Sequence, residues 1–117
     1  MSCAVSPDGD RIYVTNEDSD QLVTLSRDGT VISTLTVPGL DSLPGLHVTD
    51  SEHVLVCGCW SNKIYQVDKD RRQIPVLAEV ITENDGVTRP MSVYYSKNTG
   101  SIIVGMDGND IIVFKAV

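Results

Sequence analysis

The sequence contains no long hydrophobic run and few basic residues. No apolar stretch among its 117 residues approaches the roughly 18 needed for a membrane-spanning helix, and no charged-then-apolar segment marks a signal peptide. We therefore expect a cytoplasmic protein with no membrane partner. The formal net charge is −7, whereas binding to phosphate backbones depends on clustered Lys and Arg. Nucleic acid is therefore not the expected partner.

Cysteine is scarce and odd in number: Cys3, Cys57 and Cys59 cannot form a paired disulfide framework. On a strand, Cys57 and Cys59 point to the same side, which is poor geometry for a mutual bridge. His47 and His53 lie nearby, but the spacing of these four residues matches no closed zinc site. We expect Cys57 and Cys59 to pack in the core as small hydrophobic side chains, and we predict no metal site and no cofactor.

Motifs for nucleophilic catalysis are also lacking. His47, Asp50 and Ser51 lie within five residues, whereas a working nucleophile needs a separately held base and orienting acid. No Gly-x-Ser-x-Gly elbow and no Gly-rich phosphate loop are present. The sequence therefore predicts no catalytic residues and a protein that is not an enzyme.

A repeated pattern of short strands is what the sequence does contain. In the first copy, Ser6–Gly9 forms a turn signal, since proline presets φ, aspartate bonds its own backbone and glycine supplies positive φ. The β-branched and aromatic strand that follows has two counterparts, as does the next strand: Ile12–Val14, Val54–Val56 and Ile102–Val104; Leu22–Leu25, Ile64–Val67 and Ile111–Phe114. A repeat of about 40 to 50 residues built from short strands is typical of β-propeller blades.

The predicted fold is therefore an all-β propeller of four-stranded antiparallel blades in one domain, 1–117. Blade 1 covers about 3–36, blade 2 about 45–78, and blade 3 about 90–117 without its fourth strand. Consecutive apolar residues in the second strands indicate that both sheet faces are covered. Leu77–Ile81 reads either as a helical turn or as the end of an outer strand.

An incomplete ring of blades leaves sheet edges that invite pairing. Two arrangements follow from this. In the first, which we favour, the chain is part of a longer, six-bladed propeller. In the second, two copies form a homodimer that completes a six-bladed ring.

Two repeat families resemble parts of this pattern. The third copy is similar to the NHL repeat in its proline, turn glycine and apolar-Val and Val-Phe strands: Pro90–Val93, Gly100, Ile103–Val104, Asp107 and Asp110–Phe114. The first copy, with Ser6–Gly9 and Tyr13–Asn16, resembles the YVTN repeat. The NHL resemblance implies the C-terminal, substrate-recognition part of a tripartite-motif ubiquitin ligase, whose RING segment would lie outside this sequence.

The copies differ most in the loop between their second and third strands. Trp60 stands where the other copies have Asp18 and Gly108, and an exposed loop tryptophan suits an interface anchor; alternatively it caps the core over Tyr65. We therefore predict a non-enzymatic scaffold that binds a protein or peptide partner through its loops. The predicted partner-binding residues are Trp60, Asn62, Glu17, Asp18, Asp20, Asp107 and Asn109.

Two other functions remain open. The acidic loop residues could bind a divalent cation, as in lactonase-type propellers that hydrolyse cyclic esters through metal-bound water; the simpler interpretation is a solvated acidic face or Asx turns. The second alternative is an RNA-binding NHL propeller, with Lys69, Arg71 and Arg72 on a basic face.

Overall fold

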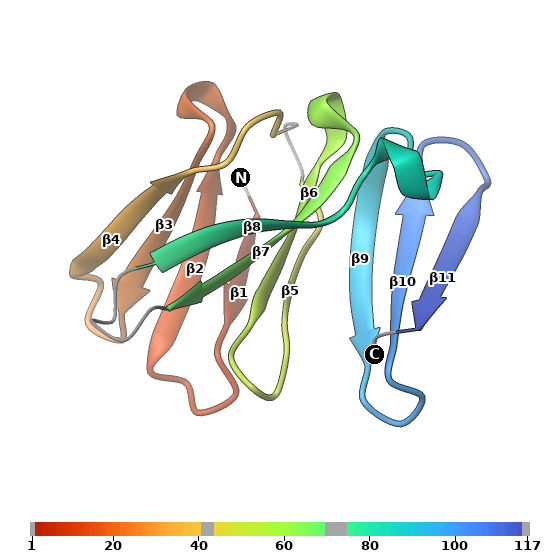
Figure 1. Ribbon diagram of the computed structural model, residues 1–117. Helices are drawn as coiled ribbons and strands as arrows, with labels where there is room; N and C mark the ends of the chain where they lie inside the picture. Colours follow the sequence, from red (N-terminus) through yellow and green to blue (C-terminus); the bar gives the residue numbers. More distant parts are fainter. Residues whose placement is uncertain (1, 41–43, 70–74, 116–117) are drawn as a thin grey trace.

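The computed structural model describes residues 2–40, 44–69 and 75–115, which form antiparallel sheets standing side by side (Figure 1). In these residues the strands make three sheets, each a meander in chain order. The first sheet contains β1 (Cys3–Val5), β2 (Arg11–Asn16), β3 (Gln21–Ser26) and β4 (Val31–Thr36); the second contains β5 (Leu46–Val48), β6 (Val54–Gly58), β7 (Lys63–Lys69) and β8 (Pro75–Ile81); the third contains β9 (Pro90–Ser96), β10 (Ser101–Met106) and β11 (Ile111–Lys115). The predicted all-β fold of four-stranded antiparallel blades is confirmed.

The turn between β1 and β2 forms as its residues predict. The Asp8 carboxylate accepts hydrogen bonds from the Ser6 hydroxyl (2.6 Å) and from the Asp10 amide (2.9 Å). Gly9 has φ of 76°, a conformation that glycine adopts without steric cost. These local bonds close the hairpin and set the register in which Tyr13 lies opposite Ala4.

The hydrophobic core lies between neighbouring sheets, and β6 supplies both halves of it. Val54 and Val56 pack into a cluster shared with the first sheet, whereas Leu55 and Cys57 pack into a cluster shared with the third. All five residues of β6 are buried, because a sheet stands on each side of it. The predicted core packing of Cys57 and Cys59 is confirmed by their exposed fractions of 0% and 1%.

The outer faces of the first and third sheets are only partly covered. Val5 and Val31 on the first sheet are 55% and 59% exposed, and Ile111 and Val113 on the third are 69% and 60% exposed. In β2 and β10, accordingly, only alternate or every third residues are buried. The prediction that both faces of every second strand are covered therefore holds for β6 alone.

Three short 3-10 helices occur in the described residues: η1 (Glu17–Ser19), η2 (Cys59–Ser61) and η3 (Glu83–Asp85). Leu77–Ile81 lies in the outer strand β8, and the helical turn follows it as η3. A capping box fixes this turn, since the Asp85 carboxylate accepts the Thr82 amide at 2.9 Å. No helix of the described residues is long and apolar enough to cross a membrane.

The two ends of the sheets differ in what they carry (Figure 1). At one end, here called the loop end, lie the β2–β3, β6–β7 and β10–β11 loops together with the segments that join one sheet to the next. The opposite end, here called the turn end, carries the tight β1–β2, β5–β6 and β9–β10 turns. Figure 1 shows the loop end at the top.

Candidate functional site

The loop end is organised by one hydrogen-bonding pattern that occurs twice. Asp20 and Asn62, the residues just before β3 and β7, both adopt the left-handed conformation, with φ of 52° and 57°, which Asp and Asn tolerate better than other non-glycine residues. The Asp20 carboxylate accepts the amide of Leu40 at 3.2 Å, and the Asn62 side-chain oxygen accepts the amide of Arg89 at 2.8 Å. Each bond ties a loop to the segment that leads into the next sheet.

The same segments are tied to the loop that follows. The Gly39 carbonyl accepts the Trp60 amide, and the Arg89 carbonyl accepts the Asp107 amide, both at 3.0 Å. Trp60 and Asp107 thus make similar backbone contacts in successive sheets, although in the strand alignment Trp60 corresponds to Gly108. The backbone at this end is therefore fixed relative to both neighbouring sheets.

Arg89 occupies a strained place in this pattern. Its φ is 46°, although it is not glycine and it precedes Pro90, which favours an extended conformation at the preceding residue. A strained backbone of this kind costs about 1–3 kcal/mol and is found most often at functional sites. Because Asn62 and Asp107 bind the two backbone groups of Arg89, they fix its backbone and the direction in which its Cα–Cβ bond leaves it.

That direction places the guanidinium group between an aromatic ring and a carboxylate. The Arg89 Cζ atom lies 4.9 Å from the centroid of the Trp60 ring, within the range of a cation–π contact. Its Nη1 lies 3.2 Å from Oδ2 of Asp107. Both members of this ion pair are about half exposed, so the pair contributes less than about 1 kcal/mol to stability. Its main effect is to orient the guanidinium.

Trp60 is not a cap on the core. Its side chain is 60% exposed, and the Tyr65 hydroxyl beneath η2 instead donates to the Ser61 hydroxyl at 3.1 Å. Trp60 therefore presents one ring face to Arg89 and keeps surface for a ligand. We name Trp60, Asn62, Arg89 and Asp107 the loop-end cluster.

A hollow of about 420 Å³ lies beside this cluster. Its lining consists of Gly86, Thr88, Arg89, Met106, Asp107 and Asp110. The guanidinium presents fixed donors that match carbonyl and carboxylate oxygens, and ligand sites of this size combine a few polar groups with apolar surface. The arrangement suits a ligand that sets an oxygen acceptor on Arg89 in the hollow and extends a flat group outward to the exposed ring of Trp60, which does not line the hollow.

The predicted site residues separate into two groups. Trp60, Asn62 and Asp107 come together in the loop-end cluster. Asp20 instead fixes Leu40, in the segment between the first and second sheets, and Asp18 and Asn109 are exposed and do not line the hollow. Glu17 lies in η1. Of the basic residues named for RNA binding, Lys69 ends β7, and Arg71 and Arg72 lie outside the described residues.

Arg89 was missed by the sequence reasoning. The one available signal was the Arg-Pro pair at 89–90, because a residue before proline at the end of a long connection is conformationally restricted. Nothing in the pattern indicated that Asn62 and Asp107 would bind its backbone from two different sheets.

The acidic residues do not converge as the divalent-cation alternative requires. Asp107 faces the Arg89 guanidinium, and Asp20 accepts the backbone amide of Leu40, in the segment between the first and second sheets. Within residues 2–40, 44–69 and 75–115, no three His, Cys, Asp or Glu side chains form a group that could hold a metal ion.

The sequence matches no family model and no curated protein. Solved structures with a similar fold are virginiamycin B lyase from Staphylococcus aureus (19% identity, TM-score 0.66) and a streptogramin B lyase (17% identity, TM-score 0.65). A catalytically inactive histidine-to-alanine variant of the S. aureus lyase, solved with quinupristin, is similar at 19% identity and a TM-score of 0.65. Each comparison covers 99% of this chain but only 40–41% of the lyase. The chain therefore spans about two fifths of these proteins.

At this identity the likeness establishes the propeller fold. The prediction that the protein is not an enzyme is overturned by the same comparison, because the solved propellers that the chain resembles are enzymes. It failed because the sequence reasoning looked for triads and phosphate loops, which a propeller enzyme need not contain. The tripartite-motif part of the NHL resemblance has no support among these neighbours.

Proposed function

We propose that the loop end of this chain is the substrate-binding part of a β-propeller enzyme that opens a cyclic ester, as a lyase or as a hydrolase. The observation that carries the proposal is the position of Arg89, whose backbone is strained and hydrogen-bonded through both its amide and its carbonyl. Its guanidinium carbon lies 4.9 Å from the centroid of the Trp60 ring, beside a hollow of about 420 Å³. The likeness to lyases of the same fold supports the enzymatic part.

Each member of the loop-end cluster has a chemical role in this proposal. The Arg89 guanidinium donates to the ester carbonyl oxygen and stabilises the carboxylate that forms when the ring opens. Trp60 stacks on a flat group of the substrate, which adds affinity and orientation. Asp107 and Asn62 keep Arg89 in place and are positioning residues. The bond-breaking group is not assigned to these residues, because the chain spans only about two fifths of the lyases.

Calorimetry with quinupristin as the probe tests the proposal on the whole chain. We expect saturable binding, weakened at least tenfold by Arg89→Met or Trp60→Ala, because a hydrogen bond to a charged group is worth about 1.5–3 kcal/mol. Arg27→Met is the matched control, since Arg27 is also an exposed, ion-paired arginine, 2.6 Å from Asp10 at the turn end. The absence of binding, or equal weakening by the control, would overturn the proposal.

The two reaction types are separated by the mass of the product. A lyase that opens a ring by elimination leaves the mass unchanged, whereas a hydrolase adds one water. Mass spectrometry of quinupristin after incubation with the protein therefore distinguishes them.

A further inference from the structure

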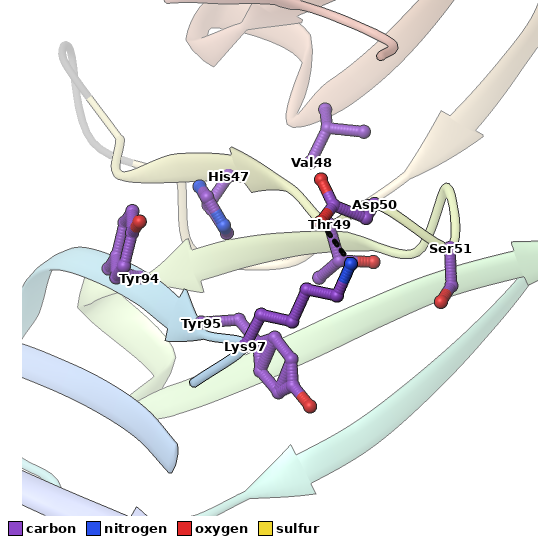
Figure 2. Close-up of a pocket in the computed structure, with 8 residues that line it drawn as sticks. All are labelled: His47, Val48, Thr49, Asp50, Ser51, Tyr94, Tyr95 and Lys97. Carbon is purple, nitrogen blue, oxygen red and sulfur yellow. Dashed lines mark ion pairs between the residues drawn. The ribbon is translucent and has the colours of Figure 1, made fainter. Parts of the chain in front are cut away.

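A second hollow lies at the turn end, between the innermost strands of the second and third sheets. It has a volume of about 480 Å³ and is lined by residues of β5, β9 and the turns that follow them. Figure 2 shows His47 beside Tyr94 at one side of this space and Lys97 reaching across it, whereas Val48 points away, toward the first sheet. The hollow contains none of the residues of the loop-end cluster, so it is a separate feature.

One wall of this hollow is aromatic. The His47 ring and the Tyr94 ring lie 4.6 Å apart between centroids, at an angle of 43°. Burial lowers the pKa of His47, so that this imidazole is neutral at pH 7 and adds no charge to the wall. Tyr94 is 55% exposed. The wall therefore offers an uncharged ring surface on which another aromatic ring can stack.

The rim of the hollow carries two opposite charges. Lys97, at the end of β9, reaches across to the turn after β5, where its Nζ lies 3.5 Å from Oδ2 of Asp50 (Figure 2). Their side chains are 79% and 69% exposed, so this ion pair contributes less than about 1 kcal/mol. A ligand can therefore separate the two groups at little cost.

The space extends outward between the two sheets. Another hollow of about 320 Å³ shares Thr49, Ser51 and Tyr95 with the first, and the rest of its lining is His53, Leu55, Gln66 and Ile102. The combination is an interior of aromatic rings and uncharged polar groups with paired charges at its entrance.

The charges decide which ligands fit. A simple cation would be attracted by Asp50 but repelled by Lys97, and a simple anion would meet the reverse. A zwitterion satisfies both. Because Lys97 and Asp50 stand next to each other at one rim and need to part only far enough to admit the ligand's charges, its ammonium and carboxylate must be close together, as they are on one α-carbon and are not at the two ends of a peptide.

We propose that this hollow binds a free aromatic α-amino acid, with its carboxylate on Lys97, its ammonium on Asp50 and its ring against His47 and Tyr94. The site is independent of the loop end and does not rest on the function proposed above. A volume of about 480 Å³ lies within the range of small-molecule sites.

L-phenylalanine is the probe that tests this site, by calorimetry and by NMR of the full chain. We expect saturable binding with shifts at His47 and Tyr94. Three analogues should each bind at least tenfold more weakly: L-alanine lacks the ring, 3-phenylpropionate lacks the ammonium and phenethylamine lacks the carboxylate. The tenfold loss corresponds to one missing charge-assisted contact for 3-phenylpropionate and phenethylamine and to the lost burial and stacking of the ring for L-alanine.

Variants and a built-in reporter complete the test. Lys97→Met and Asp50→Asn should each weaken L-phenylalanine binding at least tenfold, whereas Arg27→Met, in the comparably exposed pair with Asp10, should not. The single tryptophan, Trp60, lies at the opposite end, so its emission should stay constant. Absence of binding, equal affinity for phenethylamine, insensitivity to both variants or a change in Trp60 emission would each overturn the proposal.

Discussion

Substitution of Asn62 separates the two physical reasons for its place at the loop end. Its side-chain oxygen accepts the Arg89 amide at 2.8 Å, and its backbone is left-handed at φ of 57°. Asn62→Gly removes the acceptor and keeps the conformation accessible. Asn62→Ala removes the acceptor and keeps a Cβ in the left-handed region without the polar side chain that lets asparagine tolerate it. Asn62→Asp keeps an acceptor oxygen in the same place.

The expected losses in the free energy of unfolding follow from these differences. Asn62→Gly should cost about 0.5–1.5 kcal/mol, the net value of one hydrogen bond. Asn62→Ala should cost about 1–2 kcal/mol more than Asn62→Gly, because alanine has a Cβ in the left-handed region and glycine does not. Asn62→Asp should be close to neutral.

Urea unfolding of the three variants measures these values, and hydrogen exchange at the Arg89 amide reports the bond itself. Exchange should be faster in the glycine and alanine variants than in the aspartate variant. Asp20 is the internal control, because Asp20→Asn preserves the equivalent bond to Leu40 and should be neutral. Equal stability of the alanine and glycine variants, or unchanged exchange in the glycine variant, would refute the reasoning.

Three further predictions concern other parts of the chain. Burial raises the pKa of the Cys57 thiol to about 12 and Cys59 is buried, whereas Cys3 is exposed. A thiol reagent near pH 8 should therefore modify Cys3 alone in the folded protein, and all three cysteines in denaturant. Gly58→Ala should lower the free energy of unfolding measured in urea by about 1–3 kcal/mol, because the new Cβ would overlap the Ser61 hydroxyl and lie 2.6 Å from Cε2 of Tyr65. Gly29→Ala is the contrast, because at φ of 90° its new Cβ is strained but meets no neighbouring atom. Hydrogen bonds from Ser26 and Thr30 lower the pKa of Asp28 to about 2. Its contribution to stability is therefore complete above its ordinary pKa of 3.8 and is lost as the pH falls through 2. Asp28→Asn should make the free energy of unfolding less dependent on pH in that range.

Much of the fold could be predicted from the sequence because blades repeat. Strand length and β-branched composition recur in each copy, Asp-Gly pairs occur in the first and third copies, and local hydrogen bonds such as that from the Asp10 amide to Asp8 make the turns self-contained. The coverage of the sheet faces could not be predicted in the same way. Ile12–Val14 and Val54–Val56 look alike in sequence, yet only the second has a sheet on both sides.

The candidate site was predicted only in part. Trp60 was recognisable because a tryptophan replaces small or polar residues at the equivalent loop positions. Arg89 was not, because its importance comes from contacts with Asn62 and Asp107, which lie in other loops of the second and third sheets. A pattern read along one strand does not contain such contacts. Asp20, which also looked like a binding residue, holds Leu40 instead.

Emission from Trp60 during a titration with quinupristin tests the central claim most directly. Trp60 is the only tryptophan of the chain and lies in the loop-end cluster, 4.9 Å from the Arg89 guanidinium carbon. Its emission should change saturably, with the same midpoint concentration as calorimetry gives. In Arg89→Met that midpoint should move to at least tenfold higher quinupristin concentration. Binding that leaves Trp60 emission unaltered, or no binding at all, would contradict the assignment of the loop end as the substrate-binding site.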